Sequence, residues 1–205
     1  MKGFYSRHLF PRLLELFMDR PLFSVHRAGL LAGVTGDTLE LGAGPGLNFP
    51  HYPGAVRRLT AIDHNEGMRE KARRRAKEAG LDVAYRILDG AHLPFPDGSF
   101  DTVVSSWTLC SVDDIEGALA QVRRVLKPAG RFLFLEHGRS ADVRVARWQR
   151  RLTPFNRIVA DGCRLDRDIP ALLTGAGFDL GPLSVFPLQG APSIFATHYQ
   201  GVATL

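Results

Sequence analysis

The sequence is poor in cysteine and contains no long apolar run. Its only cysteines are Cys110 and Cys163. Their spacing matches neither a metal-binding motif nor a disulfide framework, so we expect a reducing, cytoplasmic environment and no bound metal. No stretch approaches the ~20 consecutive apolar residues that a membrane-spanning helix needs. Arg7, Pro11 and Arg12 interrupt the N-terminal segment, which does not fit a secretory signal.

The basic residues lack the arrangement that nucleic-acid binding requires. The net charge is +5, but the lysines and arginines are scattered rather than interleaved with aromatic residues in a stripe. Those between residues 71 and 77 lie between Glu66, Glu70 and Glu78 on one helical segment, which is typical of a solvated helix face. We therefore expect no nucleic-acid partner. An anionic membrane surface suits this charge better.

What remains is the composition of one globular domain. With 45% hydrophobic and 23% charged residues, the chain is long enough to bury a three-layer core without disulfides. Apolar runs alternate with helical segments, which predicts an α/β fold: a doubly wound, Rossmann-like, mostly parallel sheet of seven strands ending in an antiparallel hairpin. We expect strands at 37–41, 58–63, 82–88, 100–106, 130–136, 178–186 and 193–200, and helices at 64–79, 113–127 and 166–176.

Residues 39–46, Leu-Glu-Leu-Gly-Ala-Gly-Pro-Gly, predict a glycine-rich turn after the first strand. Gly42, Gly44 and Gly46 remove the side chains that would hold a ligand away from the backbone. About 20 residues later Asp63 ends the second strand, where a carboxylate can accept hydrogen bonds from both hydroxyls of a ribose. The pairing predicts a ligand that contains adenosine.

The loop does not complete the dinucleotide fingerprint G-x-G-x-x-G. Leu47 stands where the last glycine would be, and Pro45 has no amide hydrogen to offer a phosphate. A nicotinamide oxidoreductase is therefore disfavoured. S-adenosylmethionine fits better, because an amino acid and a sulfonium replace the phosphates of a dinucleotide.

Four blocks of sequence follow one another between residues 36 and 137. They are 39–46, 61–63, 89–101 and 124–131. In order and spacing they resemble class I S-adenosylmethionine-dependent methyltransferases of the ubiquinone-biosynthesis type. One departure is Ala129, where the family usually has a glycine, and it affects a turn rather than the site. The resemblance implies methyl transfer from S-adenosylmethionine, which leaves S-adenosylhomocysteine.

The same resemblance implies roles for individual residues. In the family the glycine loop holds the methionine part of the cofactor, the acid matching Asp63 holds the ribose, and the acid matching Asp89 holds the adenine amino group. We expect two parts in the chain, an N-terminal helical lid at 1–35 and the methyltransferase domain at 36–205. The expected cofactor-binding residues are Glu40, Gly42, Ala43, Gly44, Gly46, Asp63, His64, Asp89, Gly90, Ala91, Ser105 and Trp107.

Flanking segments are similar to a narrower group, the alkyl-thiol S-methyltransferases (the methyltransferase-like seven proteins) and their bacterial relatives. These segments are Trp107–Val112, Glu136–His137, Trp148–Gln149 and Asp161–Arg167. The similarity implies a small, lipophilic thiol acceptor. The eukaryotic members carry a long hydrophobic N-terminal segment, whereas the one here is short and interrupted by charges, so permanent membrane insertion is not implied. The expected substrate residues are Tyr5, Trp107, Cys110, His137 and Trp148.

Methyl transfer from a sulfonium is an in-line displacement, so the protein must align the acceptor and exclude water. Because sulfur loses its charge in the transition state, an apolar pocket suffices and no metal is needed. The face of Trp107 suits the sulfonium through cation–π attraction, although a core position explains this residue equally well. His137 and Asp161 are the candidate bases for an acceptor proton, each with a structural alternative.

The acceptor stays open between two classes of enzyme substrate. Ser105–Cys110 lacks the Asp/Asn-Pro-Pro-aromatic motif that orients base or glutamine amines, which disfavours those acceptors. A thiol is partly ionised at neutral pH and needs little activation. A phospholipid amine, such as that of phosphatidylethanolamine, or a quinone-like phenol remains the alternative, and a non-catalytic cofactor-binding interaction module is a third reading.

Two segments outside the core have candidate roles. Residues 4–18 place Phe10, Leu13, Leu14 and Phe17 on one helical face, which predicts packing on the domain, or a lid that makes peripheral contact with a membrane or a greasy substrate. Residues 142–161 are expected to form a substrate wall, with Pro154 breaking any helix there. We expect a monomer or a homodimer.

Overall fold

The computed structural model describes residues 2–205, and its seven strands form a single sheet in the order β3-β2-β1-β4-β5-β7-β6. Strands β1 to β5 are parallel, and β7 runs antiparallel to both β5 and β6. This confirms the predicted fold class. The strands are β1 Gly36–Leu41, β2 Val56–Asp63, β3 Val83–Ile87, β4 Phe100–Ser106, β5 Leu126–His137, β6 Asp179–Pro187 and β7 Thr197–Thr204.

Helices cover both faces of the sheet and its upper edge. They are α1 Lys2–Phe4, η1 Tyr5–Leu9, α2 Phe10–Met18, α3 Pro21–Leu31, η2 Phe49–His51, η3 Glu66–Met68, α4 Arg69–Glu78, α5 Ile115–Val125, α6 Val143–Val159, α7 Ile169–Gly175 and α8 Ser193–Ala196. Asn65 and Asp114 cap η3 and α5, each accepting a backbone N–H with its side chain.

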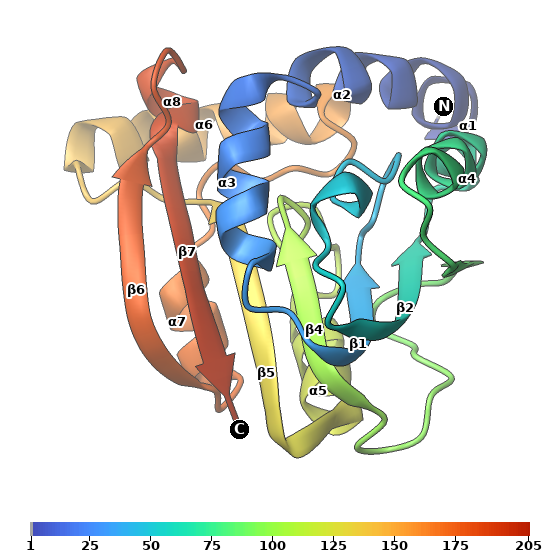
Figure 1. The fold of residues 1–205 in the computed structure, drawn as a ribbon. Helices are drawn as coiled ribbons and strands as arrows, with labels where there is room; N and C mark the ends of the chain where they lie inside the picture. Colours follow the sequence, from blue (N-terminus) through green and yellow to red (C-terminus); the bar gives the residue numbers. More distant parts are fainter. Residues whose placement is uncertain (1) are drawn as a thin grey trace.

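The hydrophobic core has two halves, one on each face of the sheet. On one face α3 and α4 pack against residues such as Ala61 and Leu133. On the other face α5 and α7 pack against Val103 and Phe132. The result is a three-layer α/β/α arrangement, with α3 in front of the sheet and α5 and α7 behind it in Figure 1.

The carboxyl ends of the parallel strands meet at one edge of the sheet. The glycine loop follows β1, Asp63 ends β2, Trp107 follows β4, and His137 ends β5. Helices α1 and α2 lie across this edge (Figure 1). This is where ligands bind in open parallel sheets, so the fold gathers the predicted site residues at one place.

Three local predictions need correction. Pro154 does not break the chain's helical path, because α6 continues through it. The carbonyl of Arg150, which loses its helical N–H partner, belongs to an exposed residue, so water can satisfy it. Strand β7 begins at residue 197, because 193–196 form α8. Leu13 and Phe17 do not share the packed face of α2, since they are 41% and 57% exposed.

Nowhere in residues 2–205 does a helix combine the length and the apolar character that crossing a bilayer requires.

Candidate functional site

The three loop glycines are required for different reasons. All have positive φ, at 67° for Gly42, 53° for Gly44 and 79° for Gly46. A Cβ at Gly42 would lie 2.2 Å from the Thr108 side chain, and one at Gly46 would lie 2.6 Å from Phe49. At Gly44 the nearest atom would be a Leu14 methyl, 3.8 Å away. Gly42 and Gly46 therefore allow tight packing, while Gly44 leaves space between the loop and α2.

Asp63 holds the glycine loop in place. Its Oδ2 accepts a hydrogen bond from the Gly44 N–H at 2.8 Å, and its Oδ1 accepts one from the Asn65 N–H at 2.7 Å. The residue is 8% exposed, and burial raises the pKa of its carboxyl despite these bonds. Each oxygen still has a free lone pair, so the carboxylate can accept further hydrogen bonds from two hydroxyls. His64 beside it is exposed, with Nδ1 3.8 Å from Oδ1.

Asp89 lies in an exposed turn one strand further along. Its Oδ1 accepts a hydrogen bond from the Ala91 N–H at 3.0 Å, which fixes the turn that includes Gly90. Leu88 is the first residue after β3, and its N–H donates a hydrogen bond to the carbonyl of Asp63 at 3.0 Å. This hydrogen bond connects the end of β2, where Asp63 is predicted to bind the ribose, to the loop after β3, where Asp89 is predicted to bind the adenine.

Glu40 and Ser105 are buried behind the loop rather than facing open space. Glu40 is 1% exposed, and its two oxygens accept hydrogen bonds from the Asn48 amide and the Tyr52 hydroxyl, both at 2.9 Å. Burial raises the pKa of Glu40 to about 7. The Ser105 hydroxyl donates to Glu136 at 2.7 Å. Both side chains support the loops that border the site.

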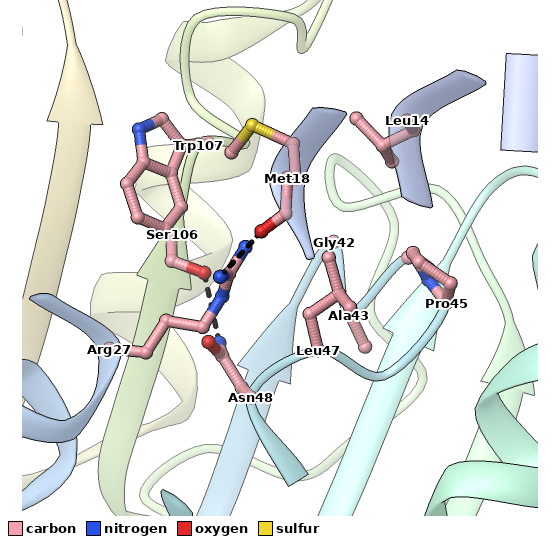
Figure 2. A pocket seen from close by; sticks show the side chains of 11 residues that line it. Leu14, Met18, Arg27, Gly42, Ala43, Pro45, Leu47, Asn48, Ser106 and Trp107 are labelled. Carbon is pink, nitrogen blue, oxygen red and sulfur yellow. Dashed lines mark hydrogen bonds between the residues drawn. The ribbon is translucent and has the colours of Figure 1, made fainter. Parts of the chain in front are cut away.

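A cavity of about 60 Å³ lies between the glycine loop and the N-terminal helices. Leu14 and Met18 of α2 and Arg27 of α3 form its outer wall (Figure 2). Small-molecule pockets usually measure ~300 Å³ or more. The N-terminal segment is therefore closed over this end of the site.

Arg27 is the charged residue of this wall and its main hydrogen-bond donor. It is 4% exposed, its Nη1 donates to the Met18 carbonyl at 2.9 Å, and its guanidinium lies 4.9 Å from the Trp107 ring centroid. Burial lowers its pKa to about 10. Only one of its donors is used in this contact, so it can bind an anion in the cavity. No sequence pattern points to Arg27, because it lies outside every recognised motif.

Trp107 adopts a strained backbone conformation at the end of β4. Its φ is 50°, which is uncommon for a non-glycine residue, and its N–H bonds to the Leu135 carbonyl at 2.8 Å. The ring packs edge-to-face with Phe23 at 5.4 Å. Its buried Nε1 has no hydrogen-bond partner in the described part of the chain. Trp107 lines the cavity, and its Nε1 lies on the edge of the ring that is turned away from the other lining side chains (Figure 2).

His137 lies beside the two cysteines. Ligand atoms of Cys110, His137 and Cys163 are all within 4.8 Å of one another. The hydrogen bond between the thiols raises the pKa of Cys110 and lowers that of Cys163. The Nε2 of His137 is buried without a hydrogen-bond partner among the described residues. Glu136 next to it fixes the chain after β4, since its Oε1 accepts the backbone N–H groups of Thr108 and Leu109.

Asp161 forms part of a latch with the N-terminal segment. Its Oδ2 accepts a hydrogen bond from the Ser6 hydroxyl at 2.7 Å, and Asn65 donates to the Ser6 carbonyl at 2.8 Å. The Tyr5 hydroxyl donates to the backbone of Val159 nearby. Tyr5 and Asp161 therefore both join the N-terminal segment to the end of α6 and the turn that follows it. Neither residue hydrogen-bonds to His137.

A second part of the latch joins α2 to α4. Glu15 forms ion pairs with Lys71 and, at 2.7 Å, with Arg75, which also pairs with Asp19 at 2.6 Å. Burial acts to raise the pKa of Glu15, but the hydrogen bonds from Lys71 and Arg75 lower it overall. The prediction of a fully solvated basic face is wrong for these two basic residues, whose side chains are only 22% and 11% exposed.

Trp148 lies apart from the cavity. It is 54% exposed on α6, with the Arg151 guanidinium 5.5 Å from its ring centroid. The neighbouring Gln149 is buried and bonds to the backbone of Ser140, Gly138 and Ile194. The turn of α6 thus puts Gln149 into the core and Trp148 on the surface.

Comparison with known proteins places this site in context. Residues 39–134 match the family described as "Methyltransferase domain". The chain is 33% identical to human thiol S-methyltransferase TMT1A over 85% of its length and 70% of the relative's. It is 34% identical to the ubiquinone/menaquinone biosynthesis C-methyltransferase UbiE of Shewanella piezotolerans, over 56% of this chain and 47% of the relative's.

It is also 35% identical to the phosphatidylethanolamine N-methyltransferase of Cereibacter sphaeroides, over 50% of this chain and 51% of that one. The chain therefore spans about half the length of two of these relatives. The crystal structure of an S-adenosylmethionine-dependent methyltransferase from Thermotoga maritima superposes with a TM-score of 0.70 at 21% identity, covering 100% of this chain and 99% of that one. This last similarity concerns the fold alone.

Proposed function

Because this chain belongs to the class I S-adenosylmethionine-dependent methyltransferases, we propose that its site transfers the methyl group to a small, lipophilic thiol. The family establishes a methyltransferase that uses S-adenosylmethionine, so the non-catalytic interaction module is set aside. The acceptor is the proposal. It is supported most by the long match to a thiol S-methyltransferase, together with Trp107, which lines the cavity, and the buried His137 at the end of the neighbouring strand β5.

The geometry fits the cofactor at several points. Asp63 offers a buried carboxylate with free lone pairs for the ribose hydroxyls, and the exposed Asp89 in the turn at 89–91 offers a carboxylate for the adenine amino group. Gly44 leaves room that any side chain would fill. We assign the methionine carboxylate to Arg27, whose guanidinium lines the cavity at the other end of the loop.

When bound, the cofactor supplies an electrophilic methyl group on a positively charged sulfur. The protein's part is to align an acceptor with that methyl and keep water away. Trp107 contributes an apolar, electron-rich face next to the cavity. We assign to His137 the task of favouring the thiolate form of the acceptor, by taking its proton or stabilising its charge. Asp161 is assigned to the latch rather than to proton transfer.

The lipophilic character of the acceptor is supported by the surface around the lid. Leu16 and Phe17 of α2 are 66% and 57% exposed, and Phe155 and Ile158 of α6 are 66% and 73% exposed. We call these four residues the apolar face. Exposed arginines stand along α6 next to it, at 144, 147, 150, 151 and 157. We propose that this face rests on an anionic membrane surface, from which a greasy acceptor reaches the site.

The proposal is tested by offering the full chain one acceptor of each class. We expect incubation with S-adenosylmethionine and an alkyl thiol to yield the methyl thioether and an equal amount of S-adenosylhomocysteine, both followed by mass spectrometry. A water-soluble thiol, phosphatidylethanolamine vesicles and a quinol are offered in parallel. Methylation of the lipid amine or the quinol with every thiol unmodified would overturn the proposal in favour of those acceptors.

A further inference from the structure

The structure gathers two cysteines and a histidine that are far apart in the sequence. Cys110 follows β4, His137 ends β5, and Cys163 lies between α6 and α7. Their ligand atoms lie within 4.8 Å of one another, and the cluster is largely buried. We propose that Cys110, His137 and Cys163 bind one Zn²⁺ ion with a fourth coordination position free for a thiolate.

The spacing of these atoms is close to what zinc requires. With Zn–S bonds of about 2.3 Å and Zn–N bonds of about 2.0 Å, tetrahedral ligands lie roughly 3.5 to 3.8 Å apart. The ligand atoms of the three residues lie within 4.8 Å of one another. Side-chain rotations that move these atoms by about an ångström bring them to the separation that zinc requires. Two thiolates and a neutral imidazole also match the preference of zinc for sulfur and nitrogen ligands, and they give a site with no net charge.

The surrounding backbone holds the ligands in place without a metal. The Arg164 N–H donates to the Cys110 carbonyl at 2.8 Å, which ties the segments of the two cysteines together. The Asn156 amide donates to the Cys163 carbonyl at 2.9 Å. The Arg167 guanidinium donates to the carbonyls of Leu109 and Val112 on both sides of Cys110. Such outer contacts are what orients ligands in metal sites.

The cluster lies behind the cavity and is separated from it by the rings of His198 and Trp107. The His137 ring lies 6.0 Å from the His198 ring, which lies 6.0 Å from the ring of Trp107. Trp107 lines the cavity. With three protein ligands, a zinc ion keeps the open position typical of catalytic sites. No fourth histidine, cysteine or carboxylate joins the cluster within residues 2–205.

This role rests on the proposed thiol methylation and deepens it. The acceptor R–SH gives its proton to water as its sulfur takes the fourth position, since a coordinated thiol is deprotonated. His137, as a zinc ligand, then favours the thiolate through the metal rather than by taking the proton itself. A lone pair of that sulfur forms the new S–CH₃ bond. The bond between the methyl carbon and the cofactor sulfur breaks, its electron pair stays on the cofactor sulfur, and the products are a thioether and S-adenosylhomocysteine.

The site is tested by binding, independently of methyl transfer. The full chain is prepared metal-free under reductant and titrated with Zn²⁺ against a chromophoric chelator. We expect one equivalent to bind, and Co²⁺ in its place to give the near-ultraviolet charge-transfer band of two thiolates. Cys163→Ser is expected to weaken zinc binding by at least about 100-fold, more than the loss of an outer-sphere partner. His92→Ala, which removes an exposed histidine, should leave zinc binding unchanged.

Calorimetry with S-adenosylhomocysteine shows that each variant is folded. A reduced parent that binds this product but takes up no stoichiometric zinc would overturn the site, as would equal zinc affinity in parent and Cys163→Ser. A Cys110–Cys163 disulfide that persists in the presence of excess zinc would overturn it as well. Zinc binding without methylation of any thiol would leave the site standing and refute the proposed function instead.

Discussion

Two buried carboxylates near the glycine loop have separate tasks. Asp63 accepts two backbone N–H groups and keeps lone pairs on the ligand side, whereas both oxygens of Glu40 are engaged by Asn48 and Tyr52. Burial raises the pKa of both carboxyls. Neighbouring acids on adjacent strands can therefore be told apart: one is suited to bind sugar hydroxyls, and the other supports the loop.

Asp63→Asn is expected to weaken S-adenosylhomocysteine binding by about 10- to 100-fold, because charge-assisted hydrogen bonds to the ribose are worth roughly 1.5–3 kcal/mol. Calorimetry with the product and with its 2′-deoxy analogue isolates the sugar contact. The parent should discriminate between the two ligands, and the variant should do so much less. Equal discrimination by both proteins would remove Asp63 from the ribose site. Glu66→Gln on the exposed side of the same turn is the control.

Glu40→Gln is expected to change how stability depends on pH. Burial raises the pKa of Glu40 from 4.5 to about 7. The folded state therefore holds a proton that the unfolded state has lost between these values, so the parent loses stability as pH rises from 5 to 8. That loss is roughly 2–3 kcal/mol, and the glutamine variant avoids it.

Urea unfolding of both proteins at pH 5 and pH 8 measures the difference. Relative to the parent, the free energy of unfolding of the variant should be higher at pH 8 than at pH 5. Glu70→Gln on the exposed face of α4 provides the comparison, since its side chain is 82% exposed. Curves for parent and Glu40→Gln that stay parallel across this range would contradict the raised pKa.

At the residue scale, what could be predicted from the sequence is what a local pattern encodes. The glycines of the loop and Asp63 follow directly from strand–turn–helix spacing. Arg27 could not be found in this way, since it comes from a helix with no motif and reaches the cavity only through the path of the lid. Cys110 and Cys163, whose spacing in the sequence matches neither a metal-binding motif nor a disulfide framework, come together only after folding.

At the scale of elements, the N-terminal segment is the part that sequence patterns described least well. The apolar pattern predicts a packed face that includes Leu13 and Phe17, but ion pairs of Glu15 with Lys71 and Arg75 turn α2 so that Leu14 and Met18 point inward. In α6, buried hydrogen bonds of Gln149 and Asn156 hold the helix through Pro154. In both cases tertiary contacts outweigh a local preference.

Glu15→Gln is expected to speed both binding and release of S-adenosylhomocysteine roughly three- to tenfold. The cavity of about 60 Å³ is too small for the cofactor, so the lid must move for the ligand to enter and leave. Partly exposed ion pairs of this kind contribute up to about 1 kcal/mol each. Stopped-flow measurement of tryptophan fluorescence gives both rates. Unchanged rates, matching those of the Glu70→Gln control, would show that the latch does not limit access.

At the scale of the whole molecule, the exposed apolar residues are not spread evenly. Leu16 and Phe17 of α2 and Phe155 and Ile158 of α6 belong to helices at the same end of the molecule, above the sheet edge (Figure 1). The Tyr5 hydroxyl bonds to Val159 at the end of α6, which joins the N-terminal segment to that helix. The helices that carry the apolar face and the arginines of α6 therefore lie at the end of the molecule where the cavity lies.

This arrangement predicts binding to anionic vesicles that depends on both charge and apolar contact. The parent should sediment with phosphatidylserine-containing vesicles at low salt and less at high salt, because ions screen the attraction of the arginines. Phe17→Glu should reduce the bound fraction several-fold, since it places a charge where an apolar ring would enter the interface. Val185→Glu is the matched control, because Val185 is a similarly exposed apolar residue, at 55%, that belongs to β6 rather than to α2 or α6. Equal loss in both variants would mean that added negative charge alone weakens binding, and that the apolar face is not the contact surface.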